Sequence, residues 1–314
     1  MKKAIIIGNR GQDGTLLTQL LKDKEYVVLG VDSATVECSD GSDWTAVDIL
    51  NMGSVANLIK VFLPDEVYYL AAFHHSSQCT DLLNSSDIWD ESFNIHVRGL
   101  INVLEVIRCT NAKIRLFYAS SCLIFGRPEQ VPQTEVTPIN PQCIYGITKA
   151  TGVHCCNFYR IHHSIFASAG ILYNHESHLR SERFVSQKII RSAIQIKRGQ
   201  QQKLVLGDLS AQADWGYAAD YVDAMWRILQ LDVADNFVIA TGKLHTVLDW
   251  VEIVFQALNL TWRDYVREEK SLIKRAQSTY VGDSSKLRRL TDWYPSTSFK
   301  EMIFNMLRLE GVLF

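Results

Sequence analysis

The sequence predicts an α/β protein built on a doubly wound parallel sheet, with a smaller mixed α/β lobe toward the C-terminus. The first observation is a short apolar strand that runs into a glycine-rich loop and then a helix at the N-terminus. The second is the alternation of short apolar runs with amphipathic helical stretches up to about residue 173, which is the pattern of consecutive βαβ units. The third is the length, because 314 residues are enough for one large α/β core or two smaller ones.

The composition excludes several classes of function. Hydrophobic residues make up 47% of the chain and charged residues 21%, as in ordinary globular proteins. The formal net charge of -2 provides no basic surface for nucleic acid and no polybasic patch for a membrane. No segment approaches the roughly 18 apolar residues of a membrane-spanning helix, and the N-terminal apolar run is too short for a signal peptide. The seven scattered cysteines favour reduced thiols in a cytoplasmic protein.

The glycine-rich loop joins a strand expected over Lys2–Gly8 to a helix expected over Thr15–Lys24. Glycines let the backbone approach a pyrophosphate, which then rests on the helix N-terminus. The position of the loop between a strand and a helix favours a Rossmann-type dinucleotide site, and a tight turn without a ligand is the alternative. The candidate cofactor-binding residues of the loop are Gly8, Gly11, Gln12, Asp13 and Gly14.

The second strand, expected over Tyr26–Gly30, is followed by Asp32, which lies 24 residues after Gly8. A carboxylate at this position can accept hydrogen bonds from an adenosine ribose and would repel a 2′-phosphate. No arginine follows closely to neutralise such a phosphate. The sequence therefore predicts NAD as the cofactor, with a turn or helix-capping aspartate as the alternative.

Two further segments are predicted to border the cofactor. Asp48 and Ile49 precede a helix expected over Met52–Phe62, and Asp48 is placed to meet the adenine amino group or to cap that helix. The strand expected over Glu66–Ala72 ends in Leu70, Ala71 and Ala72, whose small alanines allow close approach of a cofactor.

The pair His74-His75 follows that strand. Adjacent side chains diverge and no third ligand is evident, so no metal site is predicted.

The next stretch brings together residues that could move a proton. A long helix is expected over Asp90–Cys109, a strand follows over Ile114–Ala119, and Ser121 comes just after that strand. Side chains at the carboxyl end of a parallel strand open onto the crevice where such sheets bind ligands. Tyr145 and Lys149 are four residues apart in a predicted helix, so both lie on one face. A nearby cation favours phenolate, and such a tyrosine can accept a proton from a hydroxyl.

The C-terminal half is less regular. Its expected strands are Ile165–Tyr173, Lys203–Leu206 and Asp235–Thr241, and its expected helices are Arg183–Gly199, Ala218–Leu231, Val247–Leu258 and Ser298–Glu310, with a polar connector over Arg263–Lys274. We expect residues 1–173 to form the NAD-binding domain, with strand and helix returns from about residues 200–241. Residues 174–314 are expected to form mainly the substrate lobe.

Several stretches together resemble one enzyme family. They are Gly11-Gln12-Asp13-Gly14, Ser121, Tyr145 with Lys149, Gly170 to Ser177 (GILYNHES), Phe184-Val185 with Lys188, Leu206 to Leu209 (LGDL), Asp214-Trp215-Gly216 and Asp220-Tyr221-Val222. The chain resembles the extended short-chain dehydrogenase/reductases that modify nucleotide sugars, and within them the GDP-mannose 4,6-dehydratase family. The resemblance runs nearly end to end and weakens after about residue 260.

The resemblance implies roles for individual residues. Ser121 would hydrogen-bond the C4 oxygen of the sugar, Tyr145 would be the base for the C4 hydroxyl, and Lys149 would bind the nicotinamide ribose and hold down the pKa of the tyrosine. Hydride would pass from C4 to the nicotinamide and leave a 4-keto sugar. The residues expected to line the substrate site are Cys122, Leu123, Asn174, Val185, Lys188 and Arg275. Members of this family associate through helices beside the active site, so a homodimer or homotetramer is expected.

Departures from the family pattern concern the elimination step, the cofactor and the diphosphate. The dehydratases carry a glutamate two residues after the catalytic serine or threonine, and here that residue is Leu123. A leucine cannot move a proton, and Cys122 beside it has no visible activating cation. These dehydratases bind NADP through basic residues after the second strand, which are missing here. The arginine of the family before Asp-Trp-Gly is replaced by Ala213, with Lys188, Arg180 or Arg275 as candidate replacements.

Three functions remain open at this point. The first is NAD-dependent oxidation of C4 of a nucleotide sugar, a GDP-hexose or GDP-heptose, without dehydration, as a 4-dehydrogenase, a 4-epimerase or a 4-keto reductase. The second is a GDP-mannose 4,6-dehydratase-type lyase with a substituted acid/base. The third is a silent NAD-binding protein, which the intact set of Ser121, Tyr145 and Lys149 disfavours.

Overall fold

The computed structural model describes residues 1–33, 35–42, 46–74, 85–272 and 279–312. One sheet contains the strands β1 (Lys3–Ile7), β2 (Val27–Asp32), β3 (Thr35–Cys38), β4 (Glu66–Tyr69), β5 (Arg115–Ser121), β6 (Ala167–Leu172) and β10 (Asn236–Ile239). Their order is β10-β6-β5-β4-β1-β2-β3. All neighbours run parallel except the edge strand β3, which is antiparallel to β2. The predicted parallel sheet is therefore confirmed, with one added antiparallel edge.

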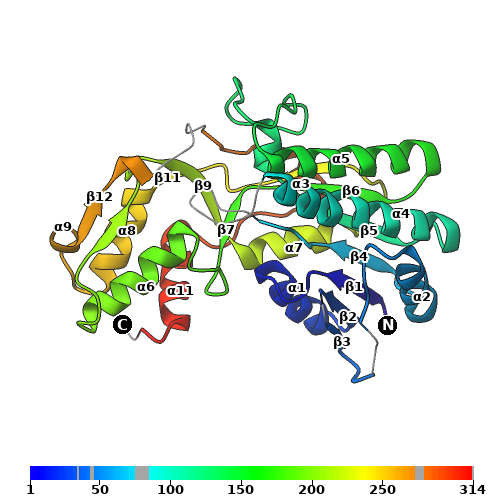
Figure 1. The fold of residues 1–314 in the computed structure, drawn as a ribbon, viewed down its shortest axis with the longest axis horizontal. Coiled ribbons are helices and arrows are strands. Elements are labelled where there is room, and N and C mark those ends of the chain that lie inside the picture. The colour runs from blue at the N-terminus through cyan, green and yellow to red at the C-terminus, as the bar shows by residue number, and fades with distance from the viewer. Residues whose placement is uncertain (34, 43–45, 75–84, 273–278, 313–314) are drawn as a thin grey trace.

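Helices cover both faces of this sheet (Figure 1). They are α1 (Gln12–Asp23), α2 (Met52–Phe62), α3 (Ser85–Phe93), α4 (Gly99–Thr110), α5 (Ile144–His163), α7 (Ala218–Ile228) and α10 (Ser285–Thr291). Alternate residues of β1 show the two layers: Ile5 and Ile7 pack with α2, α4 and α5, whereas Ala4 and Ile6 pack with α1 and α7. Strands buried on both faces read as continuous apolar runs, which is why the sequence predicted them well.

A second part of the molecule holds its own core. It consists of β7 (Asn174–Glu176), α6 (Val185–Lys197), β8 (Leu204–Leu206), β9 (Gln212–Tyr217), β11 (Leu244–Thr246), α8 (Val247–Ala257), α9 (Trp262–Tyr265), β12 (Val266–Glu268) and α11 (Phe299–Leu309). We call this part the lobe. Its strands form a three-stranded sheet, β11-β9-β7, and a two-stranded sheet, β12-β8. Trp250 and Phe255 are fully buried where α6, α8 and α11 pack together.

The chain returns from the lobe to the main sheet. Strand β10 pairs with β6, α7 packs against α1, and α10 packs against β10 and α7. The strand expected over Lys203–Leu206 is present as β8, but it pairs with β12 in the lobe and not with the main sheet. Its middle residue, Val205, is 36% exposed, so this strand is covered on one face only. Strands of the main sheet are buried on both faces.

Several local expectations also change. The helix expected over Asp90–Cys109 starts earlier, at Ser85, and is interrupted by a π-helical segment, Asn94–Arg98, between α3 and α4. The polar connector expected over Arg263–Lys274 contains the short strand β12. Short strands such as β7, β9 and β11 were not predicted, because three to six residues rarely show a clear alternation.

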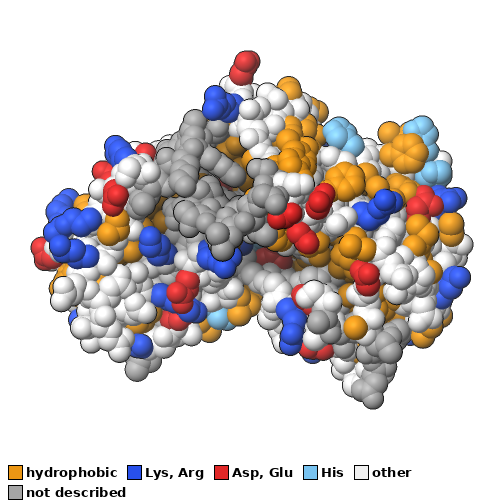
Figure 2. Space-filling view, viewed as in Figure 1, with side chains coloured by type: hydrophobic (Ala, Val, Ile, Leu, Met, Phe, Trp, Pro, Cys, Tyr) orange, Lys and Arg blue, Asp and Glu red, His pale blue; other side chains and the backbone are white. Residues whose placement is uncertain are grey.

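Figure 2 shows a surface hollowed between the main sheet part and the lobe, with charged side chains along both flanks. No helix in the described part of the chain is both long and apolar enough to span a membrane. Within the same described ranges, no group of three or more His, Cys, Asp or Glu side chains is arranged to hold a metal ion.

Candidate active site

The glycine loop is closely packed between β1, β4 and the first turn of α1. Gly8 has a φ of +92°, and a Cβ there would lie 2.8 Å from the backbone nitrogen of Ala71. A Cβ on Gly14 would lie 2.2 Å from the carbonyl oxygen of Gly8. Only glycine fits such approaches without moving the backbone. A side chain at Gly11 would meet only the Gly8 oxygen, at 3.4 Å, so Gly11 leaves space above the loop.

The structure therefore contains a cradle that fits a dinucleotide. Two of its features support this. Gly11 is the N-cap of α1, and no side chain among the described residues caps the helix there, so its first N–H groups can bind an anion. Asn9 packs its amide against Gly30 of β2, and its Oδ1 is buried without a hydrogen-bond partner among the described residues.

Asp32 lies at the end of β2, where the sequence places the ribose contact. Its carboxylate accepts hydrogen bonds from the backbone nitrogens of Ser33 at 2.8 Å and Arg10 at 3.4 Å. The Arg10 guanidinium pairs with Glu37 of β3 at 3.6 Å, with both side chains 61% exposed. Two carboxylates thus flank the only arginine of the glycine loop, which favours a neutral ribose over a phosphate.

Gln12 and Asp13 reach toward the lobe. The Nε2 of Gln12 donates to the His175 carbonyl at 3.0 Å, and Ser177 donates to Gln12 Oε1 at 2.9 Å. His175 Nε2 bonds to both Asp13 oxygens, at 3.0 and 2.9 Å, while its Nδ1 bonds to the Tyr173 carbonyl at 2.7 Å. Carboxylates and carbonyls only accept, so both ring nitrogens donate and His175 is an imidazolium.

The pKa values of this pair agree with an ion pair. Burial opposes both charges, but the Asp13 charge raises the pKa of His175 above its ordinary value. Burial likewise opposes the Asp13 carboxylate, yet the His175 charge outweighs it and the pKa of Asp13 is lowered. The loop is thereby attached to β7 of the lobe.

The other predicted cofactor residues lie along the same edge of the sheet. Leu70 donates its backbone N–H to Ile7 at 2.9 Å, Ala71 touches Gly8, and Ala72 is exposed. Asp48 is exposed and its carboxylate caps a turn by accepting from the Leu50 nitrogen at 2.8 Å. Ile49 is half-buried, and its carbonyl accepts from Asn102 at 2.9 Å.

Ser121 begins a 3-10 turn, Cys122–Phe125, at the carboxyl end of β5. Its Oγ accepts from the Leu123 backbone nitrogen at 3.3 Å. A Cβ on Gly146 would lie 2.6 Å from the Leu123 carbonyl oxygen, so this turn packs directly on the helix position next to Tyr145. The turn that carries Ser121 and Leu123 therefore lies against the start of the helix that carries Tyr145.

Cys122 belongs to the same turn but is buried in the core. Its side chain is 4% exposed and packs in the core beside α5. Burial raises the pKa of its thiol to about 12. A thiol in this state remains protonated at neutral pH and cannot serve as a base.

Lys149 is fully buried beneath Tyr145. Its Nζ donates to the Ala119 carbonyl at 2.8 Å and lies 5.7 Å from the centre of the Tyr145 ring. Burial lowers the pKa of Lys149 to about 7, against the attraction of the Asp13 charge. Burial also raises the pKa of Tyr145, which is opposite to the expected direction. Desolvation of the phenolate outweighs the nearby positive charge of Arg180.

A buried histidine supports this helix, and the sequence did not indicate it. Phe73 donates its N–H to His96 Nε2 at 2.9 Å, so the Nδ1–H of His96 donates to Thr148 Oγ1 at 2.8 Å. Thr148 in turn donates to the Ile144 or Tyr145 carbonyl, at 3.0 and 3.1 Å. Burial lowers the pKa of His96 to about 2, so the ring is neutral. The π-helical segment shifts the helical period, which is why the sequence pattern did not place His96 inward.

An aromatic cluster borders Tyr145 on the crevice side. His74 lies 5.2 Å from the Tyr145 ring and 4.9 Å from Phe184, measured between ring centres. The Arg180 guanidinium lies 3.6 Å from the centre of the Phe184 ring, and its Nε lies 3.4 Å from Glu176. The Arg180 charge partly opposes the rise in the pKa of Tyr145. Arg180, one of three candidate replacement cations, therefore lies near enough to Tyr145 to influence its ionisation.

Three of the residues expected to bind substrate lie on β7 and α6. Asn174 is half-buried, and it pairs with Trp215 where β7 runs parallel to β9. Val185 begins α6, and Lys188 donates its ammonium to the Val205 carbonyl at 2.8 Å, which fastens α6 to β8. Ala213 is 9% exposed in the lobe core, so no cation replaces the arginine at that position. Arg275 lies outside the described residues.

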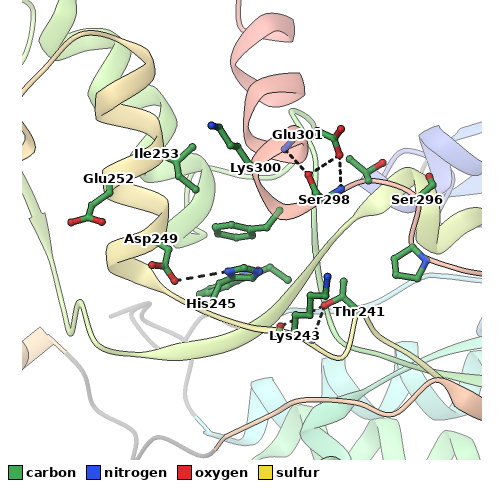
Figure 3. A pocket seen from close by; sticks show the side chains of 14 residues that line it. Thr241, Lys243, His245, Asp249, Glu252, Ile253, Ser296, Ser298, Lys300 and Glu301 are labelled. Carbon is green, nitrogen blue, oxygen red and sulfur yellow. Dashed lines mark hydrogen bonds and ion pairs between the residues drawn. The ribbon is translucent and has the colours of Figure 1, made fainter.

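A cavity of about 540 Å³ lies elsewhere in the lobe (Figure 3). Its wall combines β11, α8 and the start of α11, and includes Lys243, His245, Asp249, Glu252 and Lys300. His245 stacks on Phe299 at 3.9 Å. None of the predicted site residues lines this cavity.

Comparison with known proteins identifies the family. The family profile described as "GDP-mannose 4,6 dehydratase" matches residues 5–306. The chain belongs to the GDP-mannose 4,6-dehydratase family. The Arabidopsis thaliana protein "GDP-mannose 4,6 dehydratase 2" is 34% identical, over 98% of this chain and 86% of the relative. The resemblance drawn from the sequence is thus confirmed, and with it an enzyme of the extended short-chain dehydrogenase/reductase type.

Solved structures agree on the fold. RMD from Pseudomonas aeruginosa, complexed with NADPH, superposes with a TM-score of 0.84 at 19% identity, over 98% of both chains. The UDP-glucose 4-epimerase of Thermus thermophilus, complexed with NAD, gives a TM-score of 0.81 at 20% identity, over 99% of this chain and all of the other. These likenesses confirm the predicted Rossmann-type fold with its smaller lobe.

Proposed function

We propose that the chain oxidises C4 of a GDP-linked hexose or heptose to a 4-keto sugar with NAD, without dehydrating it. The observation that carries this proposal is the packing of the Ser121 turn against the helix of Tyr145 and Lys149, with Leu123 in the position of the family's glutamate. The packing of this turn on that helix supports the proposed redox set, whereas Leu123 at the elimination position has no exchangeable proton. The same site can act as a 4-dehydrogenase, a 4-epimerase or a 4-keto reductase.

The residues of the main sheet part are assigned to the cofactor. The loop from Gly8 to Gly14 would hold its diphosphate, Asp32 its adenosine ribose, and Lys149 its nicotinamide ribose. NAD supplies a hydride acceptor when bound, and its positive ring would favour the phenolate of Tyr145, which burial alone disfavours. Ser121 would hold the C4 oxygen while Tyr145 accepts the hydroxyl proton.

The substrate is assigned to the lobe. Asn174, Val185 and Lys188 lie on β7 and the first turns of α6, next to the loop that carries Arg180. Arg180 is held by Glu176 and Phe184 and carries a positive charge near Tyr145. We propose that this charge acts in the crevice in place of the arginine that Ala213 replaces.

The first test identifies cofactor and product. Nicotinamide nucleotide released from denatured protein would be identified, and fresh protein would then be incubated with GDP-mannose and related GDP-sugars. NADH formed in step with a 4-keto sugar is the result expected of a dehydrogenase, and a C4-inverted sugar is that of an epimerase. A 6-deoxy-4-keto product in the NMR spectrum would overturn the proposal, as would full turnover by Tyr145→Phe.

A second candidate function is the dehydratase reaction itself, which family membership favours. The variant Leu123→Glu tests it, since it returns a carboxylate to the elimination position. We expect the variant to form 6-deoxy product at a rate higher by about 10²–10⁴-fold, the usual value of general acid–base help. Leu123→Gln is the control, because glutamine has the shape of glutamate but no carboxylate. If the wild type already dehydrates as fast as Leu123→Glu, another residue performs the elimination.

We also propose that two copies associate through α3 and α5. Apolar side chains are exposed on these helices: Phe158 at 50%, Ile161 at 74%, Trp89 at 39% and Phe93 at 46%. Apolar side chains grouped in this way are typical of association surfaces. Light scattering would show a dimer or tetramer, and Ile161→Asp would yield monomer. A monomeric wild type would contradict the proposal.

A further inference from the structure

His74 occupies an unusual position beside the catalytic tyrosine. It follows β4 on the side of the sheet where the parallel strands have their carboxyl ends, and it is exposed to solvent. Its ring meets Tyr145 at an interplanar angle of 63° and Phe184 at 48°. Ring centres 5.2 and 4.9 Å apart are in van der Waals contact. The His74 imidazole thus contacts the Tyr145 ring and is also exposed to solvent.

Oxidation of an alcohol releases a proton that must leave the site. Burial raises the pKa of Tyr145, so the phenol holds a proton once it has accepted one. Lys149 is enclosed and donates to the Ala119 carbonyl. His96 is enclosed as well, with its two nitrogens occupied by Phe73 and Thr148. Neither of these neighbours connects Tyr145 with solvent.

We propose that His74 carries the proton between Tyr145 and solvent. This inference rests on the function proposed above and specifies one step of it. In oxidation, the C4–H bond breaks and its electron pair leaves as hydride to the oxidised nicotinamide dinucleotide. The hydroxyl proton passes to the Tyr145 oxygen as the phenol gives its own proton to a ring nitrogen of His74, directly or through one water, and His74 then releases that proton to bulk water. In ketone reduction, the same groups deliver a proton in the reverse order.

The charges around His74 suit transient protonation. Its described neighbours include the Tyr145 and Phe184 rings, the neutral His96, and the Arg180 guanidinium on the Phe184 ring. The positive charge of Arg180 opposes a lasting imidazolium at His74, so His74 passes its proton on. A free imidazole has a pKa of about 6.5, close to the pH at which such transfer is efficient.

The relay also bears on the outcome of the reaction. An epimerase returns the proton from Tyr145 to the same sugar, so it needs no connection to bulk water. A dehydrogenase or a keto reductase exchanges one proton with solvent in every turnover. The position of His74 therefore favours a reaction in which the keto sugar is released or taken up.

Two variants separate a proton carrier from a packing ring. His74→Phe keeps an aromatic ring between Tyr145 and Phe184 but removes the titratable nitrogens, whereas His74→Gln removes the ring. We expect both to lower kcat by about 100-fold, the low end of general acid–base help, with a smaller change in KM. Added imidazole should restore part of the rate in His74→Gln. His245→Gln, in the lobe cavity of Figure 3, is the control and should leave the rate unchanged.

A second readout requires neither cofactor nor turnover. The His74 ring signal in the NMR spectrum of the cofactor-free protein is assigned by its loss in His74→Gln. We expect the midpoint of its titration to shift in Tyr145→Phe, because the phenolic hydroxyl is removed from the ring's surroundings. The His245 signal should not shift. An unchanged His74 midpoint would contradict the proposed contact.

The two proposals can fail separately. If Tyr145→Phe is inactive while His74→Phe keeps the wild-type rate and pH profile, the relay is wrong and the C4 oxidation stands. If Tyr145→Phe retains its rate, the proposed function itself is wrong. If His74→Phe keeps the rate and only His74→Gln loses it without rescue by imidazole, His74 is a packing residue.

Discussion

His175 binds both carboxylate oxygens of Asp13, at 2.9 and 3.0 Å, and so joins the glycine loop to the first strand of the lobe. The imidazolium also stacks on Tyr221 of α7, with ring centres 4.7 Å apart. A single side chain thus connects the expected diphosphate cradle, the lobe and the returning helix. This contact makes the cradle dependent on the ionisation of His175.

The first prediction concerns the stability of this ion pair. The pKa of His175 is raised by Asp13, so its contribution is complete below about pH 6.5 and is lost as pH rises through the raised value. The pKa of Asp13 is lowered, so its contribution is lost only in strong acid. His175→Asn should lower the free energy of unfolding by roughly 3–5 kcal/mol at pH 6, the usual effect of breaking a buried pair. The loss should be smaller at pH 9, as measured by urea denaturation.

The second prediction concerns the packing of the glycine loop. Gly14→Ala places a Cβ 2.2 Å from the Gly8 carbonyl oxygen, so the backbone must move. We expect a loss of about 1–3 kcal/mol or more in the free energy of unfolding, together with loss of NAD binding. In Gly11→Ala the nearest atom is 3.4 Å away, so stability should be kept while NAD affinity falls. Equal thermal stability of the two variants would contradict this account.

The third prediction concerns cofactor choice. Asp32 accepts from the backbone of Arg10, whose guanidinium pairs with Glu37. Asp32→Ser removes the charge that repels a 2′-phosphate and leaves Arg10 available to bind it. The ratio of the Kd values for NADP and NAD should fall by about tenfold or more, equivalent to roughly 1.4 kcal/mol. Fluorescence titration measures both, and Glu37→Gln should change the ratio in the same direction.

The fourth prediction concerns the support of the catalytic helix. Thr148→Val keeps the shape of the side chain but leaves the Nδ1–H of His96 without its acceptor. A buried donor without a partner costs about 1–3 kcal/mol. We expect a lower melting temperature and a lower kcat, with the Kd for NAD changed little. Thr151→Val, whose hydroxyl bonds only to the Ile147 carbonyl at 2.9 Å on the exposed side, is the control.

The main sheet was predictable from sequence because its strands are buried on both faces. The runs Ala4 to Ile7 and Val67 to Tyr69 are buried and apolar at every position, and their short length distinguishes them from helices. The predicted site residues Asp32 and Ser121 lie at the ends of such strands, and Tyr145 was predicted from its spacing to Lys149 in a helix. These are local properties of the chain.

The remaining features depend on contacts between distant segments. The pairing of Asp13 with His175 joins residues 162 positions apart, and nothing in either local sequence indicates it. His96 points inward because of a π-helical segment, which leaves no mark in the periodicity. The raised pKa of Tyr145 follows from enclosure by the assembled crevice and was expected in the opposite direction.

The path of the chain has a mechanical consequence. It passes between the main sheet part and the lobe near residues 174, 218, 241, 285 and 298, and Asp214 accepts hydrogen bonds from Thr241, Gly242 and Gly282 at this junction. A joint made of several parallel segments cannot swing like a single linker; it yields by slight bending. Cleavage of any one connection leaves the two parts attached, and neither part could be produced alone as a continuous stretch of sequence.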